Sequence, residues 1–97
     1  MLHTINQSPF RCNSLKTSIR FILPDDPVLF LEDGVYSVQD NNTFKQTIET
    51  LLKTNPVYAI SHDINARGIK NTIKDVQLID YEGFVDLVEK HQVNTWF

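Results

Sequence analysis

The sequence predicts an α/β fold, a single domain over residues 1–97 with an open, mostly parallel sheet of four or five strands and about three flanking helices. Three observations lead to it. Short apolar runs alternate with segments whose apolar residues recur at helical spacing. The run 28–31, VLFL, is continuously apolar, as is typical of a parallel strand buried on both faces. A length of 97 residues suits one domain.

The first part of the chain predicts a strand followed by a helix. Residues 1–5, MLHTI, form a short apolar start that fits a strand. Apolar residues then recur with helical spacing over 14–22, and Asn13 before them is a suitable N-cap. Pro24 and Pro27 disfavour any continuation of this helix.

The middle of the chain repeats the same order. The strand over 28–31 is followed by Thr43 and Gln46, which have the spacing of a capping box for a helix over 44–52. Asn55 and Pro56 end that helix.

The last part predicts two more strands, over 57–60 and 76–81, and a final helix over 84–91. The segment between these strands is too short for a full crossover helix, so a helical turn over 63–66, stopped by Gly68 in the left-handed conformation, is expected. About three helices are few for the two faces of a parallel sheet. We therefore expect another chain to cover part of this sheet.

Composition narrows the function classes. The net charge is −3, and the 9 basic residues are scattered among 12 acidic ones, so direct binding of nucleic acid is not expected. A single cysteine fits a reducing compartment. The first residues do not have the pattern of a signal peptide, and no apolar run reaches the length of about 18 residues that a membrane span needs. These features predict a cytoplasmic protein without a membrane partner.

The stretch Glu32-Asp33-Gly34 follows a buried strand, where α/β proteins often place functional groups. A phosphoacceptor site there would need Mg²⁺ and a second acidic pair after the first strand, and that position has no acid. We therefore expect a turn or an interface, with Gly34 supplying a φ that other residues resist. The glycines are too dispersed for a phosphate loop and the histidines for a metal site, so no cofactor and no metal are predicted.

Cys12 and several aromatic residues are the remaining candidates. Cys12 lies beside a predicted helix N-terminus, which could lower the pKa of its thiol and suit persulfide transfer, or it is a small, partly buried residue without reactivity. Phe10, Tyr36 and Trp96 lie outside the helical stripes, where they could anchor an interface or pack on the domain's own core.

Taken together, the segments MLHT, SPF, LEDGVYS, VYAISHDINARGI and VQLIDYEGFVDLVEKH, with a near-terminal Trp96, resemble the TusB/DsrH family in order and spacing. The resemblance implies a DsrE-like α/β fold and assembly with TusC-like and TusD-like subunits into a heterohexamer. In the family scheme a TusA-like carrier delivers persulfide sulfur to a cysteine of the TusD-like subunit. A TusE-like carrier then takes it on for 2-thiolation of the tRNA wobble uridine.

The resemblance also implies that this chain is a structural subunit. DsrH-type members carry a cysteine in the first helix, and that position aligns with Ser18 here, whereas Cys12 falls earlier. Under this interpretation no residue is catalytic, and the expected contact residues are Phe10, Asp33, Tyr36, Arg67 and Trp96. Two alternatives stay open, a sulfur-carrying subunit that uses Cys12 as persulfide acceptor and a free-standing flavodoxin-like domain that binds a small ligand.

Overall fold

The computed structural model describes residues 1–97 as one α/β domain built on a five-stranded sheet. Every strand pairing is parallel, and the strand order is β4-β3-β2-β1-β5. The strands are β1 Leu2–Ile5, β2 Val28–Phe30, β3 Val57–Ile60, β4 Gln77–Ile79 and β5 Val93–Trp96. The predicted parallel α/β fold is confirmed, and the fifth strand is present.

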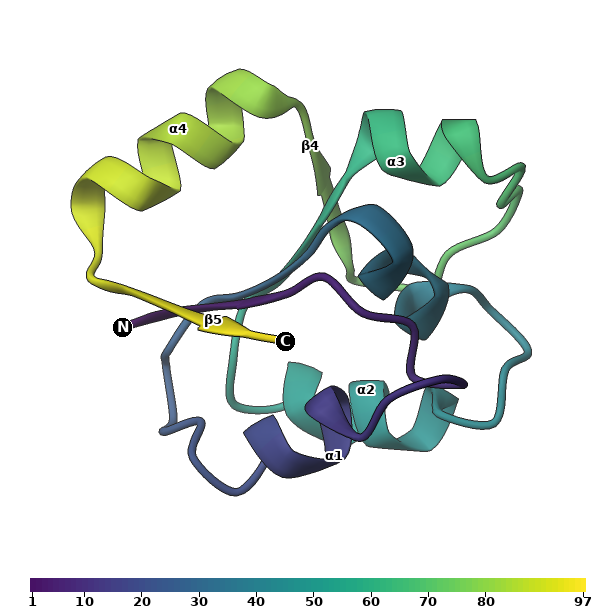
Figure 1. Cartoon of the computed structure of the whole chain (residues 1–97), viewed down its shortest axis with the longest axis horizontal. Helices are drawn as coiled ribbons and strands as arrows, with labels where there is room; N and C mark the ends of the chain where they lie inside the picture. The colour runs from purple at the N-terminus through teal and green to yellow at the C-terminus, as the bar shows by residue number, and fades with distance from the viewer.

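Four α-helices and one 3₁₀ helix accompany the sheet, one α-helix more than the sequence predicted. They are α1 Ser14–Ser18, the 3₁₀ helix η1 Glu32–Val38, α2 Lys45–Leu52, α3 Ser61–Ala66 and α4 Tyr81–Lys90. Helices α1 and α2 lie on one side of the sheet, and α4 lies on the other (Figure 1). The short α3 follows β3 directly and ends before Gly68, whose φ of 67° confirms the predicted left-handed stop.

The two faces of the sheet are covered unequally. Side chains alternate along a strand, so Val28 and Phe30 enter a main core of 13 buried residues, whereas Leu29 points to the opposite face. On that opposite face only Leu2, Leu29 and Ile60 form a buried cluster, against which α4 packs Phe84 and Leu87. No residue of α4 is itself buried. The layer over this face is therefore thin.

Strand β5 lies at one edge of the sheet beside β1, although the chain reaches it last. The chain proceeds from β1 through β2 and β3 to β4, and then returns across α4 to the other side of β1. The direction of winding thus reverses at β1 and β5. In open α/β sheets, a crevice at the carboxyl ends of strands beside such a reversal is a common place for a binding site.

Two local predictions were wrong, and the structure gives the reasons. The capping box of Thr43 and Gln46 is not formed, because α2 begins at Lys45 and the backbone N–H of Phe44 donates to Asn42 Oδ1 at 2.6 Å. Gly34 has no positive φ; the unusual backbone belongs to Glu32, with φ 51°. Gly34 is needed for space, since a Cβ there would lie 2.0 Å from the carbonyl oxygen of Ile5.

None of the helices combines the length and the apolar character that crossing a lipid bilayer requires.

Candidate interaction site

Asp33 and Arg67, two predicted contact residues, meet at the carboxyl ends of β2 and β3. Arg67 Nε donates to Asp33 Oδ1 at 2.9 Å, and its Nη1 lies 3.7 Å from Asp63 Oδ1. The other oxygen of Asp63 accepts the backbone N–H of Glu32 at 2.8 Å. These contacts tie η1 to α3 at the point where Glu32 takes its unusual φ.

The ion pair of Asp33 and Arg67 is suited to holding η1 against α3 rather than to catalysis. The side chain of Asp33 is 51% exposed, and a solvated pair of this kind contributes about 0–1 kcal/mol to stability. The carboxylate of Asp63, in the first turn of α3, does not cap that helix but holds the loop after β2. Asp33 and Arg67 thus form one surface feature whose contact with a partner stays a prediction.

Tyr36 and Phe10 occupy different settings. Tyr36, in η1, is partly buried and packs against the main core. Phe10 is 57% exposed and meets Phe44 edge to face, with ring centroids 5.4 Å apart. Phe10 also borders a polar surface hollow of about 600 Å³ that includes Lys70 and Asn71. Of the two, Phe10 is the more available for contact.

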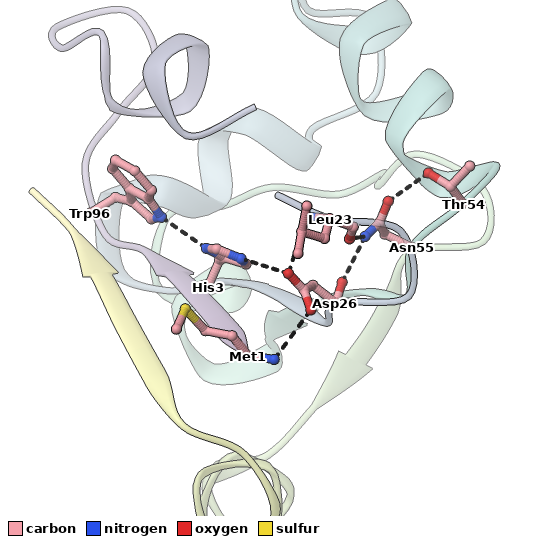
Figure 2. A network of polar contacts seen from close by, with 7 residues as sticks. All are labelled: Met1, His3, Leu23, Asp26, Thr54, Asn55 and Trp96. Carbon is pink, nitrogen blue, oxygen red and sulfur yellow. Dashed lines mark hydrogen bonds and ion pairs between the residues drawn. The ribbon is translucent and has the colours of Figure 1, made fainter. Parts of the chain in front are cut away.

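Trp96 is held within its own chain. Its indole Nε1 donates to His3 Nδ1 at 3.1 Å, and its ring stacks on Phe21 with centroids 5.6 Å apart. His3 Nε2 lies 3.1 Å from Asp26 Oδ2, so His3 connects β5 to the turn before β2 (Figure 2). The indole N–H is only a donor, so Nδ1 must be the acceptor. With Nδ1 accepting, Nε2 is the nitrogen that donates to Asp26.

Asp26 gathers several donors. Besides His3, it accepts the backbone N–H of Leu23 at 3.1 Å and the amino group of Met1 at 3.2 Å. Burial alone would raise the pKa of Asp26, but these hydrogen bonds together lower it below the ordinary value of 3.8. The amide of Asn55 holds the same turn by donating to the carbonyl oxygens of Leu23 and Asp26 (Figure 2).

The sequence placed His3 in the first strand, over residues 1–5, but gave no sign of its contact with Asp26. The turn Pro24-Asp25-Asp26-Pro27 was visible in the sequence, but aspartate is common in turns for local backbone reasons, so nothing marked Asp26 as a partner of His3. The pairing could not be assigned from sequence, since it depends on β1 lying beside β2 in the sheet.

Cys12 lies near the carboxyl ends of β1 and β5, where the winding reverses. It is partly buried and lines a surface hollow of about 390 Å³ with Arg11, Trp96 and Phe97 among its neighbours. Its Sγ lies 3.9 Å from Gln7 Oε1, the one hydrogen-bonding contact of this thiol. The position is accessible, but the structure provides neither a base nor an ion pair for the thiol.

The predicted site residues thus do not form one site. Asp33 and Arg67 pair at the ends of β2 and β3, Trp96 and Cys12 share a hollow beside β5, and Phe10 and Tyr36 stand apart. No group of three or more histidine, cysteine or acidic side chains is placed to hold a metal ion. The arrangement supplies surfaces for contact more readily than a reaction centre.

The chain is similar in sequence to one protein family and to curated proteins of nearly the same length. Residues 7–94 match the family described as DsrH like protein. Among curated proteins, the chain is 37% identical over 94 residues to Protein TusB of Yersinia enterocolitica, with 95% of each chain covered. It is 36% identical over 92 residues to Protein TusB of Photorhabdus laumondii, with 94% of each covered.

Solved structures share the fold. The ychN protein from E. coli aligns with a TM-score of 0.84 at 18% identity, covering 98% of this chain and 97% of its own. Protein Tm0979 from Thermotoga maritima aligns with a TM-score of 0.64 at 27% identity, with 95% of each chain covered. The α/β fold is therefore one that known proteins of similar length adopt.

Proposed function

The chain belongs to the DsrH family, and from that membership we propose that it is a non-catalytic, cytoplasmic subunit of a TusBCD-like sulfurtransferase complex. Such a complex would relay persulfide sulfur for 2-thiolation of the tRNA wobble uridine. The chain would assemble with TusC-like and TusD-like subunits into a heterohexamer and would hold the sulfur-accepting cysteine of another subunit in position. TusA-like and TusE-like carriers would meet the complex without binding this chain directly.

One observation carries the proposal: the identity with TusB proteins extends over nearly the whole of both chains. Two structural features support it. One face of the sheet is covered by a single helix that buries none of its residues, which suits a chain that completes its packing in an assembly. The scattered basic residues and the net charge of −3 suit a subunit that acts upstream of the tRNA.

Co-expression with TusC-like and TusD-like chains tests the assembly. We expect the three chains to co-elute in size-exclusion chromatography, with light scattering giving the mass of two copies of each. The physical reason is that association would cover the thin α4 layer. Elution of this chain alone as a stable monomer, with the other two chains assembling without it, would contradict the proposal and favour a free-standing ligand-binding domain.

A second candidate is favoured by the position of Cys12 in the hollow beside β5. In this alternative the Cys12 thiolate would attack the terminal sulfur of a donor persulfide. The S–S bond would break, the donor thiolate would leave, and the sulfur would remain on Cys12 as a persulfide. Sulfur transfer by the assembled complex should distinguish the candidates, with Cys12→Ser compared with wild type. Unchanged transfer supports the structural role, and loss of transfer in an intact complex would assign the sulfur to Cys12.

A further inference from the structure

Helix α4 carries an apolar row that its own chain leaves about half exposed. Tyr81, Val85 and Val88 follow one another at helical spacing, and they are 51%, 50% and 39% exposed. Only Tyr81 has an aromatic neighbour, with its ring centroid 6.0 Å from that of His62. The inward face of the helix is formed by other residues, Phe84 and Leu87. The row is therefore additional to the face that packs on the sheet.

A row of carboxylates runs beside the apolar row. Glu82, Asp86 and Glu89 have the same spacing, shifted by one position, so they lie along the adjoining strip of the helix. All three are exposed, and none of them takes part in an ion pair. Tyr81 and Val85 together with Glu82 and Asp86 line a surface hollow of about 400 Å³. We call these two rows and the hollow the α4 surface.

We propose that the α4 surface is a docking site for a different protein chain whose apolar contact face is bordered by lysine or arginine. The inference rests on the proposed function, which requires sister subunits, and it specifies where and by what chemistry one of them binds. Apolar side chains at the centre of an interface provide affinity, and a charged border provides orientation and association rate. The α4 surface has both parts: the three charged residues that adjoin its apolar row are all acidic, and Lys90 in the last turn lies beyond them.

The same charge pattern argues against a second copy of this chain as the occupant. A two-fold interface brings the same patch of both partners together. Two α4 surfaces would place two rows of unpaired carboxylates against each other, and each chain already carries a net charge of −3. Like charges brought together in an interface cost binding free energy. A basic partner instead neutralises them, which leaves the apolar row free to drive association.

Binding measurements with purified TusC-like and TusD-like chains test the inference. We expect Val85→Ser to weaken binding about tenfold, as loss of a buried apolar contact does. Leu23→Ser is the matched control, because Leu23 is also exposed, at 66%, but lies in the turn before β2. Both positions are exposed, so both variants should keep the wild-type melting temperature.

The charged row is tested separately. Reversing Glu82 and Asp86 together to lysine should slow association and weaken binding about tenfold at low salt, with a smaller effect as salt is raised. Glu49→Lys is the control, because Glu49 is an exposed acid on α2, on the opposite side of the sheet.

The outcomes separate this inference from the function on which it rests. If the wild-type chain assembles but all α4 variants bind like wild type, or only Leu23→Ser weakens binding, the inference is overturned and the proposed function stands. If the wild-type chain forms a homodimer that Val85→Ser dissociates, the occupant is a second copy and the inference is wrong. If the wild-type chain binds neither sister chain, the proposed function and the inference fall together.

Discussion

Replacing Gly34 with alanine should destabilise the chain by about 3 kcal/mol or more, because no rotamer change can relieve the clash it creates. The new Cβ would lie 2.0 Å from the carbonyl oxygen and 2.9 Å from the carbonyl carbon of Ile5. That oxygen accepts the backbone N–H of Leu31 at 3.2 Å, at the end of the pairing between β1 and β2. Moving it would therefore disturb the centre of the sheet. Urea unfolding followed by circular dichroism measures the loss.

Gly68→Ala provides the matched control for this prediction. Gly68 has a φ of 67°, but a Cβ there would meet nothing within 4 Å. Its replacement should cost about 1 kcal/mol from the backbone conformation alone. If Gly34→Ala lowers the free energy of unfolding no more than Gly68→Ala does, the loop after β2 can move away from β1. The steric explanation for Gly34 would then be wrong.

Replacing Asp26 with alanine should destabilise the chain by about 2–4 kcal/mol, because it leaves the Nε2–H of His3 and the backbone N–H of Leu23 without their acceptor. The ring of His3 is 2% exposed, so its Nε2–H loses its partner in a mostly buried setting, whereas the contact of the Leu23 N–H is exposed and contributes less to the loss. Asp26→Asn retains one oxygen acceptor, so it should lose less stability than Asp26→Ala. Chemical unfolding at neutral pH measures both effects.

The Asp26 effect should also depend on pH. The pKa of Asp26 is lowered in the folded chain, so the unfolded chain binds the proton first as the pH falls. The stability that the carboxylate contributes is complete above its ordinary pKa of 3.8 and is lost as the pH falls through the lower folded value. The difference in free energy of unfolding between wild type and Asp26→Asn should therefore decrease as the pH falls below 3.8.

Asp40→Asn serves as the control for the pH experiment. The side-chain hydrogen bond from Lys45 also lowers the pKa of Asp40, but this pair lies at the surface, where water can replace a lost partner. Its replacement should change stability much less than Asp26→Asn does. If Asp40→Asn and Asp26→Asn lower the free energy of unfolding equally, the stabilising role assigned to the His3–Asp26 contact is wrong.

The sequence was sufficient for the first four strands and for α1, α2 and α4 because these elements depend on local patterns, whereas η1 and β5 were not assigned to any residues. The apolar run VLFL became β2, and the helical spacing after residue 44 became α2. Gly68 stopped α3 as expected, since a positive φ is a local property of one residue. The resemblance to TusB/DsrH proteins, carried by motifs in the right order, was confirmed by comparison.

What could not be predicted depends on contacts between distant segments. Gly34 was explained by its φ, but its actual constraint is the backbone of Ile5, which the fold brings next to it. The pairing of Asp33 with Arg67 and the chain from Trp96 through His3 to Asp26 join residues 34, 93 and 23 positions apart. The exposed row on α4 was hidden for the same reason. The sequence assigned Tyr81 to a strand and began the final helix at residue 84, and which apolar residues of that helix face the sheet is decided by packing.

The most direct test of the central claim, that this chain completes its packing in an assembly through the α4 surface, is amide hydrogen exchange on the chain alone and in complex with TusC-like and TusD-like chains. We predict that α4 amides exchange readily in the isolated chain and slow at least about tenfold in the complex, while those of α2 change little. Unchanged exchange across α4 in a fully formed complex would contradict the account.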